Sequence, residues 1–309
     1  MRNIIISTST GEDKIIFLSR NSYEKVGEIK LTLPNGRCSY NYFGPHGIAL
    51  DVNRKFIYTA NSYNGSISII DMIMDKIIES IYVGTSPCHV SLCKRSNMLY
   101  TSNYDSDTIS GIDLNKKIVA VQIPVNRMPH YLEATNDGKK LYVSSMGSES
   151  LIEIDTDSNN VTKEIDIGCN ATHFYLTKNN DYIYAVGSKF DSDNKGMICV
   201  IDLKLQKSVE LYKVGMYLSD IACKESNQEM LVTDAETSYI YKIDIKDGKL
   251  IGKANTFKLP SCINMDNEKN KVIVSTQFDD ILQIFNFNDL RLLKSVSIGK
   301  DINSLNFFK

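Results

Sequence analysis

The chain has 309 residues, 42% of them hydrophobic, and its 35 basic and 37 acidic residues leave a formal net charge of −2. The charges are interspersed and form no long basic stripe, so a general affinity for nucleic-acid backbones is not indicated. No window approaches the ~20 consecutive apolar residues of a membrane span, and the first apolar run is too short for a signal peptide. We therefore expect a cytoplasmic protein that binds neither nucleic acid nor membrane, with its seven cysteines reduced.

A short strand pattern recurs along the chain. Each copy is rich in β-branched and aromatic residues and ends in small polar residues, as a buried strand that enters a turn does. The copies are IIISTS (4–9), FIYTAN (56–61), MLYTSN (98–103), LYVSSM (141–146), IYAVGS (183–188), MLVTDA (230–235) and VIVSTQ (272–277). A second run, usually ending in Ile-Asp, follows about ten residues later, and a third run comes after it. The Asp suits a hairpin turn because its side chain can bond the backbone two residues on.

One more strand precedes the copies, so each repeat holds four short strands in about 43 residues. These preceding strands begin at 46, 89, 130, 173, 220, 262 and 304. The last of them has no strands after it, and the first three strands of the chain (near 3–9, 14–20 and 24–32) have none before them. The two fragments complement each other, and their pairing removes an exposed sheet edge.

Strands this short bury their faces by stacking copies radially. The repeats therefore predict an all-β fold, a seven-bladed β-propeller with four antiparallel strands per blade. The C-terminal strand is expected to close the propeller by pairing with the N-terminal strands. We expect one propeller domain over 1–309, with blades at about 46–85, 89–126, 130–169, 173–215, 220–258, 262–300, and 304–309 together with 1–33.

The repeat resembles a known family. FIYTAN, MLYTSN and LYVSSM, followed by Ile-Asp and then a strand ending in Val-Gly or Ile-Gly, resemble the YVTN-type propeller repeat. The segment ATNDGKKLYVSS (134–145) is the most similar, and the resemblance extends over essentially the whole chain. It implies the propeller fold but little about function, because the family includes surface-layer modules, binding scaffolds and relatives of metalloenzyme domains.

The chain contains four histidines, and all of them are predicted to open the first strand of a repeat: His46, His89, His130 and His173. In the next three repeats the aligned residues are Asp220, Cys262 and Ser304. The first strand of a blade lines the central channel of a propeller. Four imidazoles from consecutive blades are therefore expected to converge near the mouth of that channel.

Neutral imidazole is a ligand for zinc, copper, iron and nickel. We therefore predict a transition-metal site with the four histidines as ligands or catalytic groups and with Asp220 and Cys262 as further candidate ligands. An all-imidazole set favours copper or iron, and zinc or nickel is the variant if Asp220 or Cys262 takes part. The structural alternative is that the histidines bond neighbouring loop carbonyls, or are copies left by repeat duplication.

Two other propeller groups are similar in this one respect. Carotenoid-cleaving oxygenases hold an axial iron with four histidines from different blades, and nitrous oxide reductase holds a histidine-rich copper cluster near its axis. The present chain differs because it lacks the large loop insertions of the oxygenases and places its histidines on consecutive blades. The resemblance implies a metal on the axis and leaves the substrate open.

Polar and aromatic residues occupy the loops expected on the same face as the histidines. Loops on a rigid scaffold are where binding residues concentrate. The predicted substrate rim consists of Tyr63, Asn103, Tyr104, Phe190, Asp234 and Gln277. We predict a metal-dependent enzyme, an oxidoreductase by preference, that acts on a small molecule or peptide. The alternatives are a metal-free lyase or isomerase with a histidine base, and a non-enzymatic propeller that binds a peptide or protein on its loop face.

Overall fold

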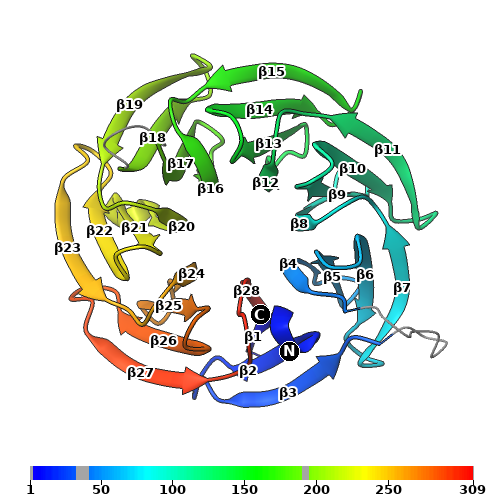
Figure 1. Cartoon of the computed structure of the whole chain (residues 1–309), viewed down its shortest axis with the longest axis horizontal. Helices are drawn as coiled ribbons and strands as arrows, with labels where there is room; N and C mark the ends of the chain where they lie inside the picture. Colours follow the sequence, from blue (N-terminus) through cyan, green and yellow to red (C-terminus); the bar gives the residue numbers. More distant parts are fainter. Residues whose placement is uncertain (1–2, 33–41, 190–194, 309) are drawn as a thin grey trace. The chain divides into compact units, whose positions relative to one another are not determined.

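A computed structural model describes residues 3–32, 42–189 and 195–308. The described strands form seven sheets, each of four antiparallel strands (Figure 1). This arrangement is the predicted seven-bladed β-propeller, and the sheets are its blades. The chain divides into two compact units.

The first unit holds four sheets and comprises residues 1–147, 152–164 and 299–309. The first two residues of its strand β14 and the last two of its strand β15 are assigned to the second unit. Its strands are β1 (Ile4–Ser9), β2 (Lys14–Ser19), β3 (Lys25–Lys30) and β28 (Leu305–Phe308); β4 (Pro45–Asp51), β5 (Phe56–Asn61), β6 (Ser66–Asp71) and β7 (Lys76–Tyr82); β8 (Pro87–Cys93), β9 (Met98–Asn103), β10 (Thr108–Asp113) and β11 (Ile118–Pro124); and β12 (Pro129–Ala134), β13 (Lys140–Ser145), β14 (Ser150–Asp155) and β15 (Asn160–Asp166). The 3-10 helix η1 (Thr10–Glu12) joins β1 to β2.

The second unit holds the other three sheets. Its strands are β16 (Asn170–Leu176), β17 (Tyr182–Ser188), β18 (Gly196–Asp202) and β19 (Lys207–Lys213); β20 (Leu218–Lys224), β21 (Glu229–Asp234), β22 (Tyr239–Asp244) and β23 (Leu250–Asn255); and β24 (Pro260–Asp266), β25 (Lys271–Thr276), β26 (Ile281–Asn286) and β27 (Leu292–Ser297). The 3-10 helix η2 (Glu225–Asn227) joins β20 to β21. In the described part of the chain no helix has the length and apolar character to span a membrane.

The two ends of the chain share one sheet, as predicted. The C-terminal strand β28 pairs antiparallel with β1, and the register sets Ile4 opposite Phe308 and Ser7 opposite Leu305. Leu305 and Phe308 are each 4% exposed. The pairing therefore supplies both backbone hydrogen bonds for β1 and apolar side chains for the core of the first unit.

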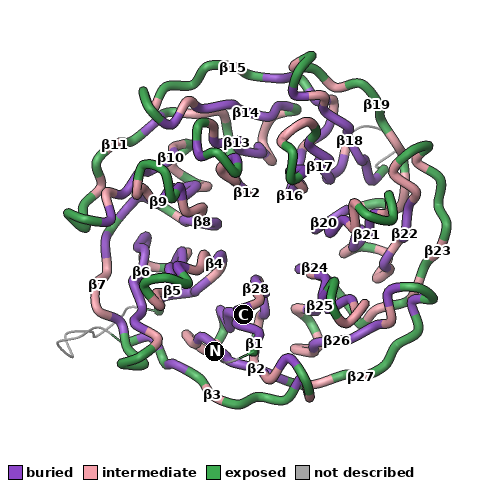
Figure 2. The backbone as a smooth tube through the Cα atoms, turned by 180° about the vertical axis from the view of Figure 1, so that it is seen from behind, coloured by how far each residue is buried: buried purple, intermediate pink, exposed green. Residues whose placement is uncertain are grey.

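Burial changes across each sheet, and Figure 2 shows exposed residues gathered on the outermost strands. The second strand is almost wholly buried, as in β5 and β9, whereas β11 and β19 are mostly exposed. Apolar clusters fill the space between neighbouring sheets within a unit. This packing explains why the second strand of the repeat is apolar on both faces and carries the most recognisable sequence pattern.

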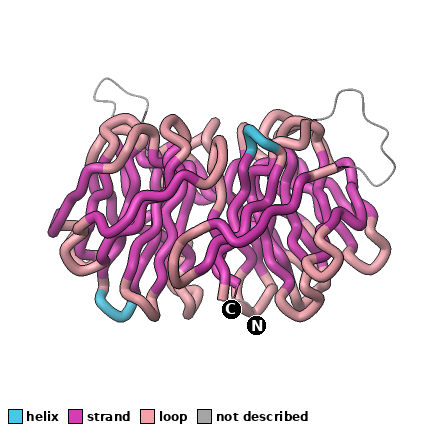
Figure 3. Tube along the Cα trace, turned by 90° about the horizontal axis from the view of Figure 1, so that it is seen from below, coloured by secondary structure: helices cyan, strands magenta, loops and turns pink. Residues whose placement is uncertain are grey.

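The loops and turns lie at the ends of the strands (Figure 3). The predicted turn role of the Ile-Asp motif is confirmed at several hairpins. Asp71 Oδ1 accepts hydrogen bonds from the backbone N–H groups of Ile73 and Met74, at 2.7 and 3.0 Å. Asp113, Asp155 and Asp202 make the same pair of bonds two and three residues on. These bonds satisfy backbone donors that a tight turn leaves without a strand partner.

Candidate functional site

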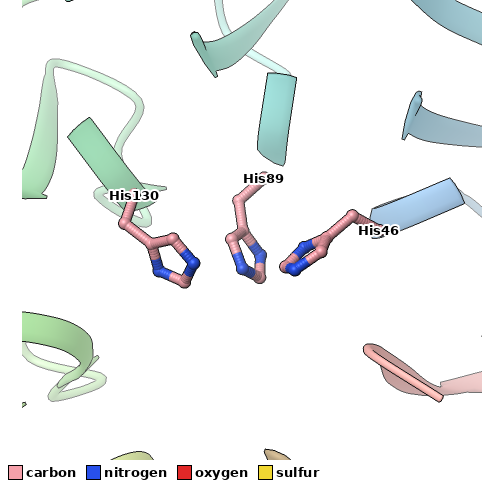
Figure 4. Close-up of side chains that lie close together, drawn as sticks. All are labelled: His46, His89 and His130. Atoms are coloured by element: carbon pink, nitrogen blue, oxygen red, sulfur yellow. The ribbon is translucent and has the colours of Figure 1, made fainter. Parts of the chain in front are cut away.

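Three histidines of the first unit point toward one another (Figure 4). His46, His89 and His130 come from β4, β8 and β12, the first strands of three successive sheets. The ring centroid of His89 lies 5.0 Å from that of His46 and 4.9 Å from that of His130. The ring centroids of His46 and His130 are 5.9 Å apart. One ring nitrogen of each lies within 4.8 Å of the others. The predicted convergence of histidines is therefore seen for these three.

Each histidine of this triad lies in a β-bulge. One extra residue interrupts the pairing with the next strand within Pro45–Ile48 of β4, Pro87–Val90 of β8 and Pro129–Leu132 of β12. A bulge bends the strand and re-aims the side chains at the extra residue. Three successive strands can thereby direct an imidazole to the same point.

The ladder register corrects the sequence alignment of the histidines. Equivalent positions on the first strands are fixed by the residue that pairs with the second residue of the neighbouring second strand: Leu50, Leu92, Ala134 and Leu176. His46 and His130 stand four residues before this position, whereas His89 and His173 stand three before it. The prediction of one shared repeat position is therefore wrong by one residue, because spacing alone does not reveal which bulge residue carries the histidine.

Hydroxyl groups hold the backbone of the bulges. Thr8 Oγ1 donates to the carbonyl of His46 at 2.9 Å, Thr101 Oγ1 to that of His89 at 2.9 Å, and Ser102 Oγ to that of His130 at 2.5 Å. These donors are fully buried and belong to the small polar ends of the recurrent strand pattern. The pattern therefore has a second role besides ending the strand, since it satisfies carbonyls that a bulge removes from the ladder.

Gly47 is required for the close approach of β4 to β8. A Cβ atom at Gly47 would lie 2.6 Å from the carbonyl oxygen of Cys88, 2.7 Å from the Cα of His89 and 3.0 Å from its Nδ1. Two of these three atoms are backbone and cannot rotate away. Gly47 was not predicted as part of the site, although a glycine within a short strand is a signal of close backbone approach.

The protonation state of His46 follows from its surroundings. Its Nδ1 lies 3.1 Å from the backbone oxygen of Cys88, and because a carbonyl only accepts, Nδ1 carries the hydrogen. Burial, reinforced by the charge of His130, lowers the pKa of His46 to about 3. His46 is therefore neutral at physiological pH, and its Nε2 lone pair is available to a ligand.

This lowered pKa predicts acid sensitivity. The unfolded chain, with an ordinary histidine pKa of about 6.5, binds a proton below that pH, whereas folded His46 does not until about pH 3. Stability should therefore fall with decreasing pH between these values, by at most about 1.4 kcal/mol per pH unit from this residue. Urea unfolding of metal-free protein at pH 7, 6 and 5 measures the effect. The His46→Gln variant should lose less stability over this range, and parallel losses in both proteins would contradict the assignment.

Two tyrosines flank the triad. The Tyr104 ring lies 6.3 Å from that of His130, and the Tyr131 ring 5.2 Å from that of His89. The Tyr131 hydroxyl is 3.5 Å from the Glu133 carboxylate, and burial raises the pKa of Glu133 to about 7. Tyr104 was predicted as part of the rim, whereas Tyr131 and Glu133 were not. Tyr131 lies in the bulge of β12, which the sequence does not display.

The other predicted rim residues of the first unit differ in exposure. Tyr63 is 63% exposed and accessible to a ligand or partner. Asn103 is fully buried, and its side-chain amide donates to Thr108 Oγ1 at 3.0 Å and Ser110 Oγ at 2.9 Å. The amide of Asn103 therefore braces the β9–β10 hairpin.

In the second unit, the structure brings Asp220 and Cys262 together. The thiol of Cys262 hydrogen-bonds the Asp220 carboxylate, which also accepts from the backbone N–H groups of Ile221 and Ile263, both at 2.8 Å. Burial raises the pKa of Asp220 to about 7. His173 lies 2.7 Å through its Nδ1 from the backbone oxygen of Ser219. The contact between His46 and Cys88 has the same form. In both, a histidine on the first strand of one sheet contacts the backbone carbonyl of a bulge residue on the first strand of the next sheet.

The remaining rim residues are Asp234, Gln277 and Phe190. Asp234 is fully buried, and its carboxylate accepts from the backbone N–H groups of Met216 at 2.7 Å and Glu236 at 3.0 Å. Its role in the described structure is to order two loops. Gln277 lies in the turn after β25, where its backbone N–H donates to the carbonyl of Leu259 at 3.0 Å. Phe190 lies outside the described residues.

The donor set of the triad fits a transition-metal ion. Histidines that bind metals usually donate their second ring N–H to a carboxylate, a backbone carbonyl or water, as His46 does to Cys88. Zinc, copper, iron and nickel all accept imidazole nitrogen. Bonds from imidazole nitrogen to zinc are about 2.0–2.1 Å long. The three ring nitrogens lie within 4.8 Å of one another, so the rings would have to rotate to bring these nitrogens closer together around one ion.

Comparisons with known proteins agree with the fold. The profile of the family "Lactonase, 7-bladed beta-propeller" matches residues 30–300, and the chain belongs to this family. No curated protein sequence matches the chain.

Several solved structures are similar. A candidate 6-phosphogluconolactonase from Bacteroides fragilis is 14% identical, with a TM-score of 0.78 over 100% of this chain and 98% of that one. A protein of unknown function from Desulfotomaculum acetoxidans is 11% identical, with a TM-score of 0.78 over 97% and 98%. Hydrazine synthase of Kuenenia stuttgartiensis is 17% identical, with a TM-score of 0.76 over 87% and 91%. At these identities the likeness concerns the fold alone.

Proposed function

We propose that His46, His89 and His130 bind one transition-metal ion and that the protein hydrolyses the ring ester of a lactone at this site. The observation that carries the proposal is the convergence of three ring nitrogens within 4.8 Å. The lowered pKa of His46 supports it further, because only a neutral imidazole is a ligand. The family to which the chain belongs supports the choice of a lactone.

Lactone hydrolysis requires a water molecule to add to the carbonyl carbon, after which the bond from that carbon to the ring oxygen breaks. The ring oxygen leaves as an alcohol and the product is a hydroxy acid, which releases a proton at neutral pH. A metal ion in such a site supplies Lewis acidity, which activates water and polarises the carbonyl.

The residues of the chain have separate parts in this scheme. The three histidines hold the ion, and the Cys88 carbonyl fixes the tautomer of His46. The rings of Tyr104 and Tyr131 form apolar walls beside His130 and His89, against which the carbon skeleton of a lactone can lie. Neither tyrosine is assigned a proton-transfer step.

Elemental analysis and a hydrolysis assay test the proposal together. Protein purified without a polyhistidine tag should contain about one equivalent of zinc, copper, iron or nickel. It should also release acid in a pH-stat from a sugar δ-lactone, with or without a phosphate group, faster than the uncatalysed reaction. Stoichiometric copper or iron without lactone hydrolysis would favour the oxidoreductase predicted from the sequence. Absence of both metal and hydrolysis, also after incubation with each metal, would favour the non-enzymatic scaffold.

The close contact at Gly47 gives a test that leaves all three ligands in the chain. In the Gly47→Ala variant the added methyl group must displace the Cys88–His89 backbone, because the nearest atoms are 2.6 and 2.7 Å away. Changes to groups that position a metal ligand typically weaken metal binding about 10–100-fold, and we expect a loss of this order. Competition with a chromophoric chelator measures the affinity. An unchanged affinity in a folded variant would contradict the view that the position of His89 matters.

A further inference from the structure

Two cysteines of the second unit lie in direct contact. Cys169 precedes β16 and Cys199 lies in the middle of β18. Both are fully buried, and their sulfur atoms are 2.7 Å apart. The contact joins residues that are 30 apart in the sequence.

This separation is short for two thiols. The thiols of Cys88 and Cys93 lie 3.4 and 3.3 Å from the carbonyl oxygens to which they donate, although oxygen is smaller than sulfur. A disulfide bond is about 2.05 Å long. The Cys169 and Cys199 sulfurs are therefore closer than an ordinary thiol contact and within a small movement of bonding distance.

Two small residues of β17 lie beside the pair. Cys199 pairs with Ala185 of β17, and two residues along the strand Gly187 pairs with Met197. Because alternate residues share a face of a strand, Ala185 and Gly187 both lie on the face of β17 next to Cys199, and their side chains fill little space. The absence of a side chain at Gly187 also admits the segment that follows Cys169, because a Cβ atom there would lie 2.0 Å from the carbonyl oxygen of Asn170 and 2.8 Å from the Cα of Ala171.

We propose that Cys169 and Cys199 form a disulfide bond under oxidising conditions. The bond ties the segment entering β16 to β18, across the intervening strand β17. The oxidant is a low-molecular-weight disulfide, which one cysteine thiolate attacks to give a mixed disulfide and one free thiol. The second cysteine thiolate then displaces the other thiol. Two S–H bonds and one S–S bond are replaced by the protein disulfide and two small thiols, which take up the two protons.

Burial of the two thiols affects the rate at which the disulfide forms rather than whether it forms. The hydrogen bond between Cys199 and Cys169, together with burial, raises the pKa of the Cys199 thiol, so the reactive thiolate is scarce in the folded protein. The bond is therefore expected to form while the second unit is open, during folding or local unfolding. Once formed, a disulfide with no exposed sulfur is protected from reducing thiols.

Refolding in a defined redox buffer tests the proposal. Reduced, denatured protein is refolded with reduced and oxidised glutathione, quenched with acid, alkylated and digested without reduction. A peptide linking Cys169 to Cys199 should dominate the mass spectrum. The oxidised protein should melt about 5 °C above the reduced protein, as closing a loop of this length predicts.

Two variants sharpen the test. Cys199→Ser should abolish both the linked peptide and the melting-temperature difference. Cys223→Ser, which removes another buried cysteine of the same unit, should retain both. Recovery of Cys169 and Cys199 as alkylated thiols or glutathione adducts from correctly refolded wild-type protein would overturn the proposal, as would a different cysteine pairing.

Discussion

Replacement of His89 by alanine is expected to abolish transition-metal binding and to lower kcat/KM for lactone hydrolysis by more than about 100-fold. His89 is the central member of the triad, with its ring 5.0 Å from His46 and 4.9 Å from His130. His46 and His130 are 5.9 Å apart and would be left as two ligands without a third donor between them. Metal content after dialysis and initial rates in the pH-stat measure the two effects.

The matched control for His89→Ala is Tyr131→Phe. Its ring lies 5.2 Å from that of His89, so both changes affect the same surroundings, but only one removes a ligand. Tyr131→Phe should keep the metal. Because His89 is only 7% exposed, its variant must also be checked for an intact circular dichroism spectrum. A folded His89→Ala protein that binds metal with wild-type affinity would exclude the triad as the metal site.

The fold could be predicted from the sequence because its repeat is carried by buried strands. The pattern of FIYTAN and its relatives reports apolar burial on both faces of β5 and its counterparts, and Ile-Asp reports a turn whose hydrogen bonds are local. Both are short-range properties that survive divergence between blades. The pairing of β28 with β1 followed from counting, since each terminal fragment lacks what the other supplies.

The site could be predicted only in part, because its geometry depends on β-bulges in the first strands that carry the histidines. Spacing placed the histidines on successive first strands, but the bulges decide which residue faces the cluster, and His89 is offset by one residue from His46. Asn103 and Asp234 have the polar character of rim residues, yet both are buried and bond backbone or hydroxyl groups of their own hairpins. A polar residue after a strand can serve either purpose, and only tertiary contacts distinguish them.

The contact between Cys169 and Cys199 was not predictable from the sequence for a related reason. The expectation of reduced cysteines rested on their odd number and irregular spacing. Spacing carries no information about a pair that meets across β17, since one cysteine lies in a connection between sheets and the other in a third strand. Such a pair is defined by the stacking of strands, which the repeat pattern describes only to within a residue or two.

Removal of residues 302–309 is expected to unfold the first unit at 37 °C. The deletion eliminates β28 and with it three side chains that are at most 4% exposed: Ile302, Leu305 and Phe308. Burial of a large apolar side chain stabilises a fold by about 1.5–3 kcal/mol, so their loss amounts to about 5 kcal/mol or more, comparable to the whole stability of many domains. The unpaired edge of β1 also becomes a template for aggregation.

Thermal and urea unfolding of the truncated chain and of two point variants separate the contributions. Leu305→Ala should cost about 2–5 kcal/mol, because the cavity lies in the core between β28 and its neighbours. Phe307→Ala is the control on the same strand: its ring is only partly buried and stacks against Arg20 at 5.6 Å, so a loss below about 1.5 kcal/mol is expected. If the truncated protein melts cooperatively at the wild-type temperature, β28 contributes no stability and the pairing of the two chain ends is not what holds this sheet in the fold. A truncated chain that regains its structure when a peptide of residues 300–309 is added would locate the loss in that strand.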